Sequence, residues 1–298
     1  MKLFFTALAV VAAAVSVAAS PAKRAPSETD ALQFVLAFEH VEHAFYTNAL
    51  AMFDEQAFAD AGFPPWVRGR FEQIAEHEAA HVAFLTNALG KTAVQPCTYD
   101  FNVSSPIPNP VQSFVFFAAR LEDEVVSAYL GALQYIKNPA YLTAVAAILS
   151  TESRHQAWIS SAVQHLNPWS GAFGTPLDFD ESYAFLTQYD TSCPSTNPPL
   201  PVDRKIPDIT YLAEDGDVQG GRIKIFSKLP SDKNLSVAFL SGLSPVFEPL
   251  HGDEFRLPEI GGTLYFAVTT SDSVVNDDNL VTTPAIVYLP FPANATSP

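Results

Sequence analysis

Residues 32–50 read LQFVLAFEHVEHAFYTNAL, and the same theme returns three times before residue 163. The later stretches are FEQIAEHEAAHVAFLTNAL (71–89), VFFAARLEDEVVSAYLGAL (115–133) and AYLTAVAAILSTESRHQAWISSA (140–162). In the first and third stretches a Glu precedes a Tyr by seven residues: Glu39 and Tyr46, then Glu122 and Tyr129. In the second and fourth a Glu precedes a His by three: Glu78 and His81, then Glu152 and His155.

Apolar residues recur in all four stretches with the period of an α-helix. The pattern predicts a first helix from Leu32 up to the breaker AGFPP, a second over 66–89, a third over about 111–136 and a fourth over about 140–165. Residues 91–110 are too long for a tight turn, which predicts a crossover along a four-helix bundle. A short helix is expected at 179–189.

In each predicted helix, polar residues stand within the stripe that is otherwise apolar. A carboxylate in such a position is costly unless it is paired or coordinated, and Glu and His three residues apart share one helical face. Two Glu helices with two E-x-x-H helices supply the ligand set of a dinuclear carboxylate site. The predicted ligands are Glu39, Glu78, His81, Glu122, Glu152 and His155. The alternative is that these residues form buried hydrogen bonds or half-exposed helix faces.

Several neighbours of these residues have less certain roles. Tyr46 and Tyr129 could hydrogen-bond to the ligating groups from outside the metal's own shell. His43 shares the stripe of Glu39 and is a candidate outer partner or extra ligand, and Glu42 stays unassigned. Residues off the stripes are expected at the surface, solvated or in salt bridges: Glu72, Glu76, His77 and Glu124, together with His40.

The hydrophobic period changes after residue 200. Residues 201–207 predict a linker, and 208–298 contain short runs rich in Val, Ile, Phe and Tyr, separated by Gly, Asp, Asn and Pro. Runs at 221–228, 235–241, 263–270 and 285–289 favour a small β-sandwich. The predicted class is therefore α+β with two domains: a four-helix bundle with its C-terminal extension over 25–200, then an all-β domain.

The N-terminus has the pattern of a targeting segment. Residues 1–19 predict a signal peptide, and 20–24 predict a short pro-segment that ends in Lys23 and Arg24. We therefore expect a secreted protein, extracellular or in a cell wall, without a transmembrane anchor after processing. Glycosylation sequons begin at Asn102, Asn234 and Asn294. The two cysteines, Cys97 and Cys193, are expected to form a disulfide after export, the alternative being two unrelated thiols.

The formal net charge is −16. Such an acidic chain repels phosphate backbones, which excludes nucleic acid as an expected partner. Solubility is the simplest reason for the charge.

The sequence also resembles the secreted fungal ferritin-like proteins, and more distantly the plant desiccation-related proteins. The strings that carry the resemblance are LAFEHVEHAFY, AGFPPWVRGRFEQIAEHEAAHVAFLTNALG, SAYLGA, TESRHQAWISSAV, PWSGAF and TSCPS. The resemblance implies a ferritin-like bundle, an extracellular setting and a role in development or stress. The ferritin-like ligand pattern falls on the same six Glu and His residues. The signal segment, the sequons and the extra β domain depart from iron-storing ferritins.

Two functions follow as hypotheses. The first is a dinuclear centre of iron or manganese, or zinc, with dioxygen or peroxide as reactant, which would make the protein an oxidoreductase. The alternative is a non-catalytic stress or developmental protein that uses the bundle as a scaffold. Cell-wall components are candidate partners, and carbohydrate binding by the β domain is a third reading.

Overall fold

The computed structural model describes residues 26–101, 107–202, 206–276 and 278–289 of the 298-residue chain. The predicted signal peptide and pro-segment, and the sequons at Asn102 and Asn294, lie outside these ranges. Asn234 is exposed in the loop before strand β5, so this sequon is accessible. No helix in the described part of the chain is long and apolar enough to cross a membrane.

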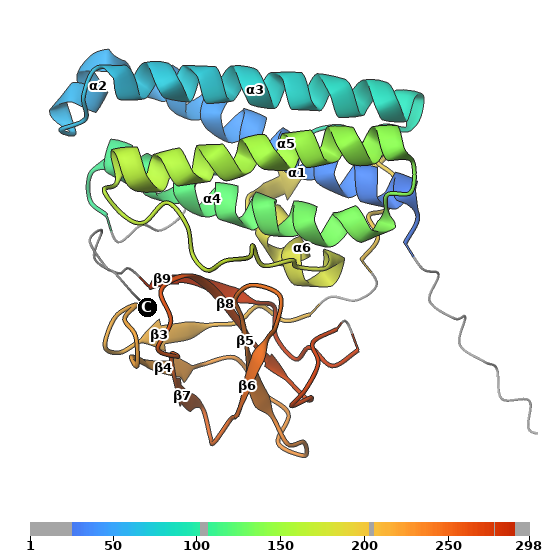
Figure 1. Cartoon of the computed structure of the whole chain (residues 1–298), viewed down its shortest axis with the longest axis vertical. Helices are drawn as coiled ribbons and strands as arrows, with labels where there is room; N and C mark the ends of the chain where they lie inside the picture. The colour runs from blue at the N-terminus through green and yellow to red at the C-terminus, as the bar shows by residue number, and fades with distance from the viewer. Residues whose placement is uncertain (1–25, 102–106, 203–205, 277, 290–298) are drawn as a thin grey trace, which may run out of the picture.

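Four long helices form the upper layer of the molecule (Figure 1). They are α1 (Glu28–Met52), α3 (Trp66–Leu89), α4 (Pro110–Ala132) and α5 (Pro139–Trp158). Helix α1 packs mainly against α3, and α4 mainly against α5, while α1 also contacts α4. A short helix, α6 (Phe179–Thr187), lies between this bundle and the β strands. The structure thus confirms the predicted α+β class with a helical N-terminal part.

The start of each helix has a local cause. Ser27 and Asp30 form a capping box at α1, and Asp178 and Glu181 form another at α6. Asn109 and Asn138 accept backbone N–H groups at the starts of α4 and α5, each with Pro at the first helical position. Helix α3 ends at Gly90, whose φ is +62°.

One predicted helix end was wrong. The first helix stops at Met52, not at the AGFPP breaker, because Asp54 accepts the N–H of Ala57 and starts the separate helix α2 (Glu55–Asp60). Arg68 donates to the carbonyls of Leu50 and Phe53 and so satisfies the end of α1. Helix α5 changes at Ile159 into one π-helical turn that ends at Val163.

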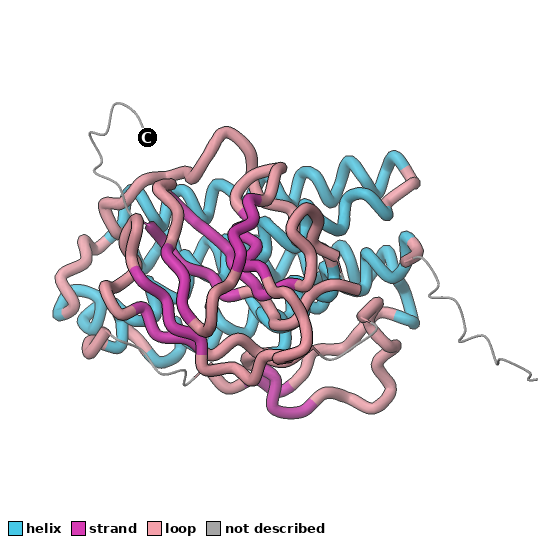
Figure 2. Tube along the Cα trace, turned by 90° about the horizontal axis from the view of Figure 1, so that it is seen from below, coloured by secondary structure: helices cyan, strands magenta, loops and turns pink. Residues whose placement is uncertain are grey.

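The C-terminal part is a sandwich of two antiparallel sheets, as predicted. One sheet has the order β3-β4-β7 (Tyr211–Ala213, Arg222–Ile225, Glu254–Arg256). The other has the order β6-β5-β8-β9 (Val246–Pro249, Ser236–Leu240, Gly262–Thr269, Ala285–Leu289). Side chains such as Ile223, Phe255 and Phe266 form a core between them. Seen from below, the strands cover the underside of the bundle (Figure 2).

The outer face of one sandwich sheet joins the hydrophobic core of the bundle. Tyr265 and Ile286 belong to the same buried cluster as the residues of α1 and α4. The Tyr265 hydroxyl donates to the carbonyl of Asp123 in α4, and the Thr263 hydroxyl donates to the Asp123 carboxylate at 2.8 Å. Every residue of β8 is buried. The β sandwich is therefore packed on α4 rather than tethered beside it.

Cys97 and Cys193 are joined by a disulfide. Cys97 lies in the crossover, directly before β1 (Thr98–Tyr99), and Cys193 directly follows β2 (Asp190–Ser192), the partner of β1. Gln33 of α1 also holds the crossover, since its side chain bonds to Thr92 and Val94. The part of the crossover before residue 102 is thus fixed against both α1 and the segment after α6.

Replacing both cysteines by Ser should lower the stability of the protein. The disulfide closes a loop of 96 residues, and the chain-entropy model gives such a loop about 4.7 kcal/mol. Urea unfolding of the double variant should measure a loss of this size. An unchanged free energy of unfolding would mean that hydrogen bonds alone hold the crossover.

Gly131→Ala should destabilise the protein although alanine favours helices. A Cβ at Gly131 of α4 would lie 1.7 Å from the carbonyl oxygen of Leu177, so the irregular segment leading to α6 would have to move. We expect a loss of about 3 kcal/mol, the upper range for overpacking. Gly171→Ala is the matched control, because a Cβ there meets no atom within 4 Å. Thermal unfolding should separate the two variants.

Candidate metal centre

The six predicted ligands converge at the axis of the bundle. Glu39 comes from α1, Glu78 and His81 from α3, Glu122 from α4, and Glu152 and His155 from α5. All four glutamates are fully buried, and the side chains of His81 and His155 are 12% and 7% exposed. Because each helix presents these residues on its apolar stripe, helix packing brings them to one point.

The residues form two groups that could each hold a metal ion. Glu39, Glu78, His81 and Glu152 form the first, and Glu78, Glu122, Glu152 and His155 form the second. In each group one ligand atom per residue lies within 4.8 Å of the others. Glu78 and Glu152 belong to both groups.

Each histidine directs Nδ1 at the carboxylates of its group. His81 Nδ1 lies 2.9 Å from Glu152, 3.1 Å from Glu78 and 3.2 Å from Glu39. His155 Nδ1 lies 2.9 Å from Glu152, 3.4 Å from Glu78 and 3.5 Å from Glu122. Both rings therefore use the same nitrogen toward the centre.

Each of the two tyrosines donates a hydrogen bond to the glutamate that belongs to the other repeat. Tyr46 of α1 donates its hydroxyl to Glu122 of α4, and Tyr129 of α4 donates to Glu39 of α1. All four side chains are fully buried. Each tyrosine thus fixes one carboxylate oxygen and leaves the other directed at the centre, the arrangement of an outer partner of a metal ligand.

Charge makes this cluster unstable without cations. Burial lowers the histidine pKa values, but the carboxylates outweigh it and raise the pKa of His81 to about 12 and of His155 to about 11. Burial raises the pKa of Glu78 well above its ordinary value, and Glu152 adds to this by repulsion. Burial also acts on Glu152, but its bonds to His155 and His81 bring its pKa down to about 2. The two imidazolium rings are thus the cations that hold the carboxylates together.

Several carboxylate oxygens still lack a hydrogen-bond donor among the described residues. One buried oxygen each of Glu39, Glu78, Glu122 and Glu152 has an imidazole Nδ1 at 2.9–3.5 Å but no regular hydrogen bond, because each Nδ1 already bonds to another oxygen. Both oxygens of Glu42 lack any donor in the described part of the chain. Buried carboxylate oxygens without donors are costly, and cations satisfy them. Four carboxylates and two imidazoles are also the donor atoms that iron, manganese and zinc accept. The residues present therefore fit a metal centre.

Glu42 is the residue that the sequence left unassigned. It lies one turn after Glu39 in α1 and is fully buried. Burial raises its pKa well above the ordinary value, and repulsion from Glu152, Glu78, Glu122 and Glu39 adds to the effect. Glu42 thus brings the number of buried carboxylates in the cluster to five.

His77 provides a link from the centre to the surface. Its Nδ1 lies 2.9 Å from Nε2 of His155, on the side of that ring away from the carboxylates. His77 is exposed, as expected, but sequence reasoning missed this contact. Both rings line a cleft of about 220 Å³ between α3 and α5, with Arg70, Arg154 and Trp158 among its other residues. Solvent therefore reaches the edge of the centre.

The structure does not bring every expected neighbour to the centre. His43 is half-buried, and the described residues offer it no hydrogen bond to the ligands. Two residues expected at the surface are buried. Glu124 accepts from Arg120 and Gln188 at 2.9 and 3.0 Å, and His40 contacts the carbonyl of Val94 at 3.0 Å. The prediction of surface positions was wrong here because α6 covers α4 and the crossover covers α1.

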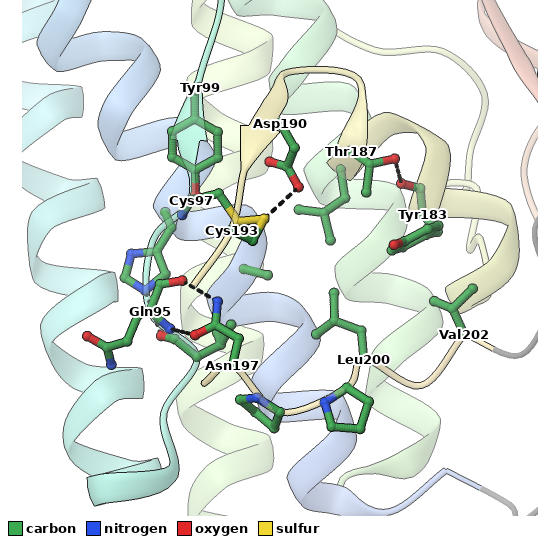
Figure 3. Close-up of a pocket in the computed structure, with 16 residues that line it drawn as sticks. Gln95, Cys97, Tyr99, Tyr183, Thr187, Asp190, Cys193, Asn197, Leu200 and Val202 are labelled. Carbon is green, nitrogen blue, oxygen red and sulfur yellow. Dashed lines mark hydrogen bonds between the residues drawn. A yellow bond between two sulfur atoms is a disulfide. The ribbon is translucent and has the colours of Figure 1, made fainter. Parts of the chain in front are cut away.

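A separate cavity of about 470 Å³ lies beside the disulfide (Figure 3). It is lined by residues of α1, the crossover, α6 and the segment after β2, with Tyr99, Tyr183 and Asp190 among them. Asp190 also groups with Cys97 and Cys193 as a candidate metal site. The two sulfur atoms are bonded to each other, so this group is not a thiolate site.

Comparison with known proteins agrees with this geometry. Residues 27–165 match the family model of the ferritin-like domain. This part of the chain is therefore similar to ferritin-like domains, a class whose bundles commonly bind metals. The chain is also similar to Protein rds1 of Schizosaccharomyces pombe, with 26% identity over 169 residues. The match covers 57% of this chain and 40% of that protein, so the chain spans less than half of its relative.

Metal should raise the thermal stability of the protein. An ion that binds only the folded state adds about 2.7 kcal/mol per site at a free concentration 100 times Kd. Differential scanning fluorimetry with Fe(II), Mn(II) or Zn(II) should show a higher Tm than the same protein in chelator. The double variant Glu78→Ala with His81→Ala should lose the increase. Equal melting of the wild type with metal and in chelator would contradict a metal site.

Proposed function

We propose that this protein is a secreted metalloprotein that holds two ions of iron or manganese in its bundle and acts as an oxidoreductase on dioxygen or peroxide. The observation that carries the proposal is that the two ligand groups share Glu78 and Glu152. Carboxylates common to both groups would hold two ions side by side. Glu39 with His81 would complete one ion's set, and Glu122 with His155 the other's.

Oxygen and nitrogen donors favour iron or manganese, with zinc as a redox-inert competitor. When bound, two redox-active ions would supply electrons to the small oxidant. The chain's own contribution is position: Tyr46 and Tyr129 hold Glu122 and Glu39, and His77 contacts His155. The cleft between α3 and α5 offers a route for a small reactant to His155.

Secretion and a role in stress or development are parts of the same proposal. The N-terminal pattern and the disulfide support an oxidising compartment. The competing function is that of a non-catalytic protein whose bundle serves only as a scaffold. Such a protein would show no oxidation chemistry.

Metal analysis of single variants should test the pair of ions. The wild type should bind about two ions per chain, as carboxylate-bridged bundles do. Glu39→Ala and Glu122→Ala should each retain about one, since each residue belongs to one group only. Glu152→Ala should retain fewer than either, because it serves both groups. One ion in the wild type, or equal losses in all three variants, would contradict the shared arrangement.

Oxidation chemistry needs a separate measurement. Purified protein given Fe(II) and dioxygen should consume dioxygen faster than Fe(II) does in buffer, as followed with an oxygen electrode. Given Fe(II) and peroxide, it should likewise consume peroxide faster than Fe(II) does in buffer. The Glu78→Ala and His81→Ala double variant should react at the rate of buffer alone. A wild type that binds two ions but consumes no oxidant would favour the scaffold function.

A further inference from the structure

Glu42 differs from the other carboxylates of the centre. Glu39, Glu78, Glu122 and Glu152 each accept at least one hydrogen bond. Glu42 is fully buried, yet neither of its oxygens has a donor among the described residues. It also lies three residues after Glu39, on the same face of α1, and feels the charges of all four other glutamates.

The internal repeat shows that packing does not require a carboxylate here. Glu39 and Tyr46 correspond to Glu122 and Tyr129, and the residue three positions after Glu122 is Val125. Val125 is as fully buried as Glu42. One half of the centre thus fills this position with an apolar side chain, whereas the other half buries an unpartnered carboxylate, which is costly in the absence of a nearby cation.

Charge balance suggests what this carboxylate does. Four carboxylates neutralise two divalent ions, and a fifth neutralises one positive charge more. In a buried site of low effective dielectric, a nearby unit charge changes ion affinity strongly. The arrangement is therefore better matched to a pair of ions that carries more than two divalent charges.

Building on the proposed function, we propose that Glu42 is the charge-selecting carboxylate of the centre, which raises its affinity for trivalent over divalent ions. Its carboxylate is buried in α1 near the four ligand glutamates and would act on bound ions by its negative charge. The class of ligand it favours is a small trivalent cation, the higher oxidation state of iron or manganese.

The test compares closed-shell ions, so that no redox step intervenes. Competition titrations with Zn(II) and with Ga(III), supplied as citrate, should be run on the full chain and on Glu42→Gln. Glutamine keeps the shape and removes the charge. We expect Glu42→Gln to lower the Ga(III) affinity about tenfold or more, and the Zn(II) affinity by less. Glu42→Val, which copies the residue of the other repeat, should give the same change in the ratio.

Glu124→Gln is the matched control. Glu124 is also fully buried and carries a charge near the bundle, but Arg120 and Gln188 occupy its oxygens. This variant should keep the wild-type ratio of Ga(III) to Zn(II) affinity. The proposal would be overturned if Glu42→Gln kept the wild-type ratio of Ga(III) to Zn(II) affinity. It would also be overturned if Glu124→Gln changed this ratio as much as Glu42→Gln does.

Thermal unfolding of the metal-free variants separates ion selection from a structural role. Because Glu42 has no donor, metal-free Glu42→Gln should melt at the wild-type temperature or above. A lower melting temperature, or failure to fold, would give the carboxylate a structural role and overturn the inference. The proposed function fails by a different result, a wild type that binds neither ion.

Discussion

Negative charge buried at the axis of the bundle is the constraint on which the rest of the structure depends. Five carboxylates meet there, and among the described residues two imidazolium rings balance their charge while two tyrosine hydroxyls donate hydrogen bonds to them. Their mutual repulsion would drive the helices apart unless other contacts held them together. The surrounding apolar core, the fixed crossover and the sandwich against α4 provide these contacts.

The two halves of the centre are related but not equivalent. The Glu-Tyr helices and the Glu-His helices repeat in order, and the ligand groups mirror one another through Glu78 and Glu152. Two of the differences between the repeats lie at the centre. Glu42 has Val125 as its counterpart, and His77, beside His155, has Thr151. One ion position would thus differ from the other in charge or in exposure to solvent, as is useful when two ions have unequal tasks.

Helical periodicity was enough to predict the six converging side chains, because residues on an apolar stripe must face a common core. It also separated Glu78 from Glu76 and Glu122 from Glu124. Periodicity could not predict the burial of Glu124 or His40. An apolar stripe shows which face of a helix points toward the bundle core, but it does not show which other segments cover the outer face. Gln188 of the chain after α6 and Val94 of the crossover cover these residues. The break at Phe53 depends on the cap of Asp54, which no stripe reveals.

The exchange of tyrosines between the repeats has a consequence for the origin of the bundle. Tyr46 serves Glu122, and Tyr129 serves Glu39, so neither helix pair completes its own half of the centre. Two identical copies of one helix pair, related by a twofold axis, would make the same exchange. A duplicated ancestor could therefore have worked as a symmetric dimer before fusion. Within a single chain, residues such as Glu42 can differ between the halves, and a sandwich can cover one side only.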